Sequence, residues 1–296
     1  MYKNVSEYLA KLKKELGQSV DRALIQDALS DAETHLRNAL DEELSKNPNA
    51  SEEKLLSPLI EKYGTPAEVA SAYRAMEPHI SHAPSRPSRT VRHSLLGKFF
   101  SVLTESSAWG AFVYLVFAFI PGILFGGWAL FAGLVSASML VFIIGLPFFG
   151  GYLLSLRGIA LLEGRIIEAL LGVRMPQRPQ FFQKGSGWWD KFRALVRDPY
   201  SWKALVYFAL LFPLGFIYSA LFSLLFTLSL SFVLSPVLEL VFRLPLDLVG
   251  DNVFTPLWLL PFVCLGGFFL LPLTFHLAKL FGRFHGRFAK SMLVRK

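Results

Sequence analysis

The stretch SSAWGAFVYLVFAFIPGILFGGWALFAGLVSASMLVFIIGLPFFGGYLLSL, residues 106–156, runs for 51 residues without one Asp, Glu, Lys or Arg. A charged side chain at the centre of a bilayer costs about 3 kcal/mol or more, so a run of this kind is typical of a segment in lipid. As one helix the stretch would be about 76 Å long, whereas the hydrocarbon core of a bilayer is about 30 Å thick. It therefore predicts two antiparallel membrane spans joined by a tight turn.

The composition of the whole chain supports the same class. Of the 296 residues, 53% are hydrophobic and 15% aromatic, which lies outside the usual range of soluble proteins. Cys264 is the only cysteine, which rules out an intrachain disulfide and a cysteine-based metal site. The first strongly apolar stretch begins near Ala108, so the start of the chain does not resemble a cleaved signal peptide. We expect an integral membrane protein whose N-terminus is cytoplasmic.

The charges divide the chain into two parts. Residues 1–80 hold 10 Lys and Arg against 14 Asp and Glu, whereas the remaining residues hold 20 against 8. The basic residues flank apolar spans instead of forming a soluble basic face. This distribution favours contact with anionic lipid headgroups and argues against a nucleic-acid partner.

Residues 1–80 are predicted to form a small cytoplasmic bundle of four helices. Apolar residues recur every three or four positions between Val5 and Leu16, from about Val20 to Lys46, and again after Ser51. A break then follows at Gly64, Thr65, Pro66 and Glu68. Glycine suits a helix end, threonine caps the next helix with Glu68 in a capping box, and proline fits a first turn.

This region resembles the HAAS signalling-domain family. The resemblance rests on YLAKLKKEL (residues 8–16), a long acidic helix, and LIEKYGTPAEVASAY (residues 59–73) before the membrane part. Members of the family have a Leu-Gly-Asp-Pro-type break, and here Thr65 replaces the Asp. The resemblance implies an interaction module coupled to membrane parts and not a catalyst.

A basic Pro- and Ser-rich linker at residues 81–96 separates this bundle from a membrane domain, residues 97–296. Four spans are expected, at about residues 108–130, 134–156, 204–232 and 256–277. Residues 157–203 hold nine Lys and Arg and the tail from Lys279 holds six, whereas residues 239–251 hold one Arg and three acids. The excess of basic residues on one side predicts cytoplasmic N- and C-termini. The predicted fold is therefore all-α.

The segment between spans two and three is expected to lie at the membrane surface. Residues 157–171 and 188–197 each mix apolar and charged side chains at helical spacing, which indicates interfacial amphipathic helices. Gly172 ends the first, and Asp198 with Pro199 begins the third span. The candidate lipid or partner interface comprises Arg157, Glu163, Arg165, Trp188, Trp189, Arg193, Asp198 and Trp202.

A second resemblance covers about residues 96–285. LPFFGGYLLSLRGIALLEGRIIEALLGVRMP (146–176) and RDPYSWKALVYFALLFPLGF (197–216) are similar to the four-span sensor domain of bacterial membrane proteins, which often precedes a histidine kinase. The resemblance rests on Arg157, Glu163, Arg165, Leu171-Gly172, Pro176, Asp198-Pro199 and Trp202. No kinase follows the last span here, so we expect output through the N-terminal bundle or a separate partner.

Chemistry-bearing motifs are absent from the sequence. No P-loop, HExxH, GxSxG or Cys/His cluster is present, which predicts no catalytic residue, no metal site and no cofactor. The expected span interiors contain no ionisable group except His276 at the cytoplasmic end, which argues against transport. The Gly122-x-x-x-Gly126 spacing allows close helix contact, either within the bundle or in a homodimer.

We therefore expect a non-enzymatic signalling or sensor component of the bacterial inner membrane. It would relay an envelope or lipid-borne signal to a protein partner, such as a regulator, a kinase or another membrane protein. Two alternatives stay open: a transporter or lipid-acting enzyme that uses Glu163 with Arg157 or Arg165, and a passive membrane scaffold.

Overall fold

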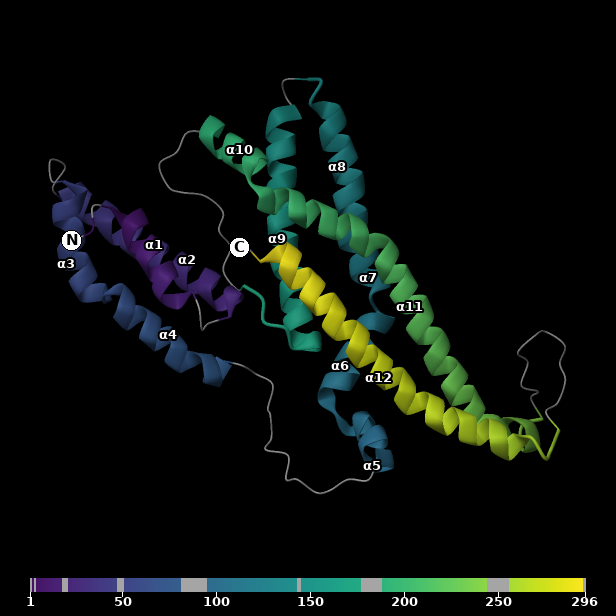
Figure 1. Cartoon of the computed structure of the whole chain (residues 1–296). Coiled ribbons are helices and arrows are strands. Elements are labelled where there is room, and N and C mark those ends of the chain that lie inside the picture. Colours follow the sequence, from purple (N-terminus) through teal and green to yellow (C-terminus); the bar gives the residue numbers. More distant parts are fainter. Residues whose placement is uncertain are drawn as a thin grey trace.

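The computed structural model describes residues 2, 4–17, 21–46, 51–80, 95–142, 145–176, 188–243 and 256–294. Within these ranges the chain is helical with short connections, and no strand is assigned. Figure 1 shows the N-terminal helices α1 to α4 beside a larger group of long helices. The all-α prediction is confirmed. Of the linker predicted at residues 81–96, residues 81–94 lie outside the described residues, and residues 95–96 begin α5 (Leu95–Phe100).

The N-terminal group, which we call the head, contains α1 (Val5–Leu16), α2 (Arg22–Lys46), α3 (Glu52–Tyr63) and α4 (Pro66–Ile80). Its core consists of side chains from the apolar faces that the sequence predicted. Leu12 on α1, Leu36 on α2 and Leu56 on α3 are all fully buried. Asn4 begins α1 by accepting a hydrogen bond from the Glu7 N–H, as an N-cap residue does.

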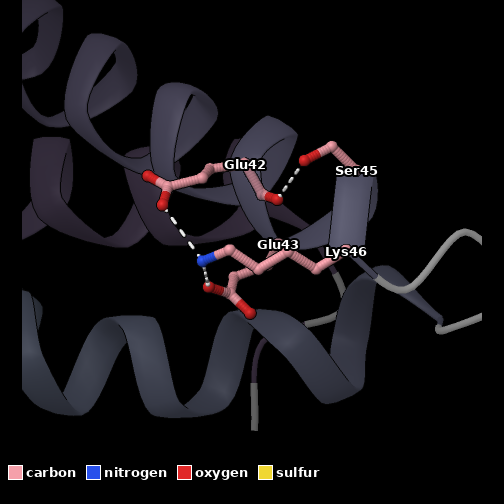
Figure 2. Close-up of polar contacts among 4 residues, drawn as sticks. All are labelled: Glu42, Glu43, Ser45 and Lys46. Carbon is pink, nitrogen blue, oxygen red and sulfur yellow. Dashed lines mark hydrogen bonds and ion pairs between the residues drawn. The ribbon is translucent and has the colours of Figure 1, made fainter.

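The acidic C-terminal end of α2 lies on the surface of the head. Lys46 Nζ lies 3.0 Å from Glu42 Oε1 and 2.9 Å from Glu43 Oε1, and Ser45 donates to the Glu42 carbonyl (Figure 2). The hydrogen bond to Glu43 and the bond to Glu42 raise the pKa of Lys46. These exposed ion pairs belong to a solvated helix end.

The second group, which we call the body, begins with α5 (Leu95–Phe100) and a 3₁₀ turn at Ser101–Thr104. The first long segment combines α6 (Ser106–Val116), α7 (Phe119–Pro121), the π-helix η2 (Gly122–Gly126) and α8 (Gly127–Met139). The regular α-helix is interrupted after Val116, within about one turn of Pro121, whose missing N–H removes an α-helical hydrogen bond, and the π-helix follows Pro121. The body continues with α9 (Gly145–Leu171), α10 (Trp188–Arg197), α11 (Pro199–Leu240) and α12 (Leu260–Leu293).

Four of these segments are long and apolar enough to cross a membrane: Ser106–Met139, Gly145–Leu171, Pro199–Leu240 and Leu260–Leu293. They are longer than the expected spans, and their ends differ. The turn expected at residues 131–133 lies in continuous helix, and the chain reverses instead between Met139 and Gly145. Pro147 falls in the first turn of α9, where a proline costs no helical hydrogen bond.

The body places large apolar side chains on its outside. Phe131 is 72% exposed, Val141 is 84% exposed, and similar side chains occur along α11 and α12. Inside the body, α11 packs along α12 and crosses the first segment at Gly215, where a Cβ would lie 2.4 Å from the Ala118 carbonyl oxygen. Gly122 lies against this same part of α11, so the Gly122-x-x-x-Gly126 spacing serves packing within the chain.

Candidate functional site

A layer of four polar side chains lies inside the body, one from each long segment. Tyr114 of α6 donates to Glu163 Oε1 of α9 at 2.6 Å, and its oxygen lies 2.8 Å from His285 Nε2 of α12. Tyr207 of α11 donates to the same Glu163 oxygen at 3.3 Å and lies 3.2 Å from the same histidine nitrogen. Two tyrosines thus connect one acidic and one basic side chain. We call these four residues the polar layer.

The four residues of the polar layer lie at one depth. Each is eight residues from a helix end, namely Ser106 of α6, Leu171 of α9, Pro199 of α11 and Leu293 of α12. Eight residues of α-helix correspond to about 12 Å. The four ends themselves do not lie together, because Asp198 at the start of α11 pairs with Arg157 of α9, and Phe192 of α10 lies on Gly150, near the start of α9.

The polar layer is closed to solvent and incompletely bonded. Glu163 and His285 have no exposed surface, and Glu163 Oε2 and His285 Nδ1 are buried without a hydrogen-bond partner. Buried polar atoms are normally paired, so two orphaned atoms in one layer call for a functional explanation. An ionisable side chain buried among membrane-spanning helices is itself a mark of a functional site.

The segment after α9 covers the polar layer. Gly172 has a φ of +66° and ends α9, as the sequence predicted. The chain then returns along the bundle: Val173 packs on Gly286, next to His285, and Met175 packs on Gly164, next to Glu163. A Cβ on Gly286 would lie 2.6 Å from the Val173 side chain, so the glycine permits this close cover.

The expectation that the span interiors lack ionisable groups, apart from His276, is wrong for the helices as the structure defines them. α9 and α12 continue past the expected span ends, and this extension brings Glu163 and His285 inside the bundle. Residues 157–171 do not form a separate surface helix, since they are the last four turns of α9. His276 contacts the Phe99 carbonyl at 3.0 Å and stacks on the Phe99 ring.

The sequence reasoning missed Tyr114, Tyr207 and His285 as members of a site. The tyrosines lie in apolar helices where an aromatic residue is unremarkable, and His285 lies in a basic tail among four Lys and Arg of the described helix end. One signal was present: both Glu163 and His285 precede a glycine, and both glycines turn out to be packed by the covering segment.

A second polar contact joins α9 to the start of α11. Arg157, which is buried, lies 2.7 Å from Asp198 Oδ2 and donates to Ser201 Oγ at 3.0 Å. The other oxygen of Asp198 accepts from the Tyr200 N–H and caps α11, with Pro199 in the first turn. The cap that the sequence predicted is therefore present, and it also binds an arginine from the preceding span.

The eight residues expected to form one interface fall into two groups. Arg157, Glu163 and Asp198 make contacts inside the body, whereas Arg165, Trp189, Arg193 and Trp202 are exposed. The side chain of Trp188 lies outside the described residues. Trp189 and Arg193 lie on α10, where they line a cavity of about 370 Å³ together with Phe192, Val196 and Arg197. Aromatic rings beside arginines suit the headgroup level of a membrane.

The break motif of the head has the predicted geometry. Glu68 Oε2 accepts from the Thr65 N–H at 2.8 Å, and the Glu68 N–H donates to Thr65 Oγ1 at 3.4 Å, which together make a capping box. The backbone hydrogen bond from Thr65 lowers the pKa of Glu68. Gly64 has a φ of +111°, and its carbonyl accepts from the Tyr8 hydroxyl of α1 at 2.8 Å. Burial raises the pKa of Tyr8.

α12 connects the body to the head. Lys279 pairs with Glu105 at the start of α6, His285 belongs to the polar layer, and Lys290 pairs with Asp21 at the start of α2. His285 and Lys290 are five residues apart, about 7.5 Å along the helix. One rigid element thus touches both the polar layer and the head.

These features define a multi-pass helical membrane protein with a helical head and a polar layer buried among its spans. Residues 122–293, more than half of the chain, match the family described as "Putative sensor", and the chain belongs to this family. Residues 7–72 match the HAAS family. Both resemblances found in the sequence are confirmed, in the same order along the chain. No curated protein and no solved structure matches the chain.

Membership of this family supports a sensor or signalling role at a membrane. A sensor-family domain also fits a non-enzymatic role. Within the described ranges, no cluster of three or more His, Cys, Asp or Glu residues could hold a metal ion.

Proposed function

We propose that this protein is a non-enzymatic sensor of the bacterial cytoplasmic membrane that passes the state of the membrane to a protein partner through its head. The observation that carries the proposal is the double role of α12, whose His285 lies in the polar layer and whose Lys290 pairs with Asp21 of the head. A rotation or shift of α12 that changes the polar layer also moves the contact with the head.

Charge supports a cytoplasmic position for the head. The basic residues of 157–203 and of the C-terminal tail belong on the cytoplasmic side according to the positive-inside rule, and α12 ends on that side. The head contacts this end of α12 through Asp21. These charges support a cytoplasmic position of both termini, where a soluble partner would have access to the head.

The input is proposed to come from the lipid phase. The exposed Trp189 and Arg193 of α10 present an aromatic ring and a cation beside α9, where Phe192 of α10 lies on Gly150. Arginine pairs with phosphate through two parallel hydrogen bonds, which suits anionic headgroups. α10 leads directly into Asp198, whose partner Arg157 lies on the same helix as Glu163.

Photo-crosslinking in native membranes, followed by identification of the captured proteins, tests the role of the head. The whole chain should capture a specific partner that a chain without residues 1–80 does not capture. In membranes of raised anionic lipid content the yield of that partner should change. An identical set of captured proteins for both chains would contradict the proposal.

Asp21→Asn separates partner binding from relay. The asparagine keeps an oxygen that can accept from the Ala23 N–H, as Asp21 Oδ1 does at 2.9 Å, but it removes the charge that pairs with Lys290. The variant should still capture the partner, while the dependence of the yield on lipid charge should be lost. Asp41→Asn, at an exposed position of α2, is the matched control and should keep that dependence.

The polar layer favours a second candidate function, which is proton-coupled transport. Buried acid and histidine side chains connected by hydroxyl groups occur along proton pathways of pumps and transporters. Vesicles containing the purified protein would then dissipate an imposed pH gradient, and Glu163→Gln would stop the flux. A sensor leaves the gradient intact in both forms.

A further inference from the structure

We infer that Tyr114, Glu163, Tyr207 and His285 form a proton-binding site whose occupancy sets the position of α12. The inference deepens the proposed function, because it names the ligand to which the body responds, and its role in signalling rests on that function. The chemistry of the site itself depends only on the contacts within the polar layer.

The hydrogen count in the polar layer is the first argument. Four contacts of 3.3 Å or less connect the two hydroxyl groups to Glu163 Oε1 and His285 Nε2. Two hydroxyl hydrogens can serve only two of them. If His285 carries a hydrogen on Nε2, it donates to one tyrosine while both tyrosines donate to Glu163, and three contacts become hydrogen bonds. This arrangement leaves a carboxylate and an uncharged imidazole.

The two orphaned atoms are the second argument. In the arrangement just described, Glu163 Oε2 and His285 Nδ1 both have free lone pairs, and both are buried without a partner. A proton added at Oε2 gives a carboxylic acid, and a proton added at Nδ1 gives an imidazolium connected to the carboxylate through the tyrosines. Either addition removes the net negative charge from a site that is closed to solvent.

The packing around the polar layer identifies the size of the ligand. Glu163 and His285 have no exposed surface, and the covering segment lies against the glycine that follows each of them. The described cavities of 370 to 530 Å³ are lined by other residues. A proton is the ligand that needs no cavity, so a closed and unevenly bonded cluster suits it.

The surroundings of the site are mostly apolar. Tyr218 of α11 meets the His285 ring edge-on at 5.6 Å, and Phe288 of α12 flanks the same ring. Arg283 and Arg287 of α12 are exposed, as is Arg165 of α9. Arg174 lies in the covering segment between Val173 and Met175, and its Nε is buried without a partner. Exchange of the proton therefore requires movement of the covering segment or of α12, which couples occupancy to helix position.

The test uses the full chain in lipid vesicles and follows the proton directly. Infrared difference spectra during a reversible pH titration report the carboxylic acid of Glu163, and ¹⁵N resonance spectra of labelled histidine report His285. We expect one of these signals to change with pH in the wild type. This pH-dependent change should be absent in E163Q. E33Q removes a surface carboxyl group of the head and should leave the signal unchanged.

Y114F provides a second, milder variant in case E163Q folds poorly. It removes the hydroxyl group that makes the two shortest contacts, so the titration midpoint of the signal should shift while the signal itself stays. A signal that survives in E163Q, or the lack of any pH-dependent signal from either group in the wild type, would overturn the inference.

Coupling to the head is measured by the distance between spin labels at Lys13 and Ser291 in a chain whose Cys264 is replaced by alanine. Both label sites are exposed. The distance distribution should differ between the protonated and deprotonated forms of the wild type and should not change with pH in E163Q. An unchanged distribution in the wild type would overturn the assigned link to α12. If the head captures no partner while the polar layer still titrates, the proposed function is wrong but the proton-binding site stands.

Discussion

The head and the body are built in opposite ways. In the head, leucines such as Leu12 and Leu56 are fully buried, and most charged side chains lie outside, with Asp27 as a buried exception. In the body, Phe131 and Val141 are largely exposed, while Glu163 and His285 are fully buried. Water around the head makes the burial of apolar side chains favourable. Lipid around the body is itself apolar, so exposed apolar side chains carry no free-energy cost there. Apolar periodicity therefore identifies the core of the head, but in the body the polar residues mark the interior.

The largest effect is expected when the same acidic residue is placed on the outside of the body and of the head. Ile217 lies near the middle of α11 and is 58% exposed, and Ile217→Asp should cost about 4 kcal/mol of insertion free energy at the bilayer centre. Ala67→Asp places the acid on the exposed first turn of α4, where the change should stay within about 0.5 kcal/mol. The membrane-integrated fraction of the full chain measures both.

Ile217→Val is the apolar control for the body and should insert as the wild type does. Equal integration of Ile217→Asp and the wild type would mean that this face of α11 does not contact lipid. The contrast between the head and the body would then be wrong, because it assumes that the apolar exterior of the body lies in lipid.

A smaller effect is expected where the body packs backbone against backbone. A Cβ at Gly215 would lie 2.4 Å from the Ala118 carbonyl oxygen, so Gly215→Ala forces α11 away from the first segment and should cost about 2 kcal/mol. Gly266→Ala on α12 is the matched control, because no atom lies within 4 Å of its Cβ position. Thermal unfolding in detergent should show a lower midpoint for Gly215→Ala alone.

Equal unfolding midpoints for the two glycine variants would show that α11 and the first segment can separate without a loss of stability. Such a result would also weaken the view that the body is one packed unit. The head offers no equivalent experiment, because its helices meet through the side chains of Leu12, Leu36 and Leu56.

The sequence predicts the head almost completely. Its four helices, the Thr65 and Glu68 capping box and the glycine break all follow from local rules that depend on neighbouring residues. Gly172 and Asp198 were predictable for the same reason, since a left-handed helix end and an N-cap are local features. The family membership of the chain was also visible in these motifs.

The polar layer could not be predicted in this way. It needs four helices to meet, and the register that brings Tyr114 to Glu163 and Tyr207 to His285 depends on close approach at glycines. The ends of the membrane helices were misplaced for a related reason. The second span was predicted to end just before Arg157, because the sequence does not reveal that Asp198, 41 residues later, neutralises this arginine. Charge marks the end of a span only where the charge has no buried partner.

The smallest effect concerns a carboxyl group of the head, Glu68, which lies at the surface and forms its bonds within one turn. The Thr65 backbone N–H lowers the pKa of Glu68 below its ordinary value of 4.5, so the folded head prefers the ionised form. The resulting stability is present above pH 4.5 and is lost as the pH falls through the lower pKa of the folded state.

Glu68→Gln keeps the capping bonds without titrating, so the stability difference between wild type and variant should shrink on acidification. Hydrogen exchange of α4 in the full chain measures it, with Glu61→Gln as an exposed control; a difference that stays constant with pH would contradict the assignment.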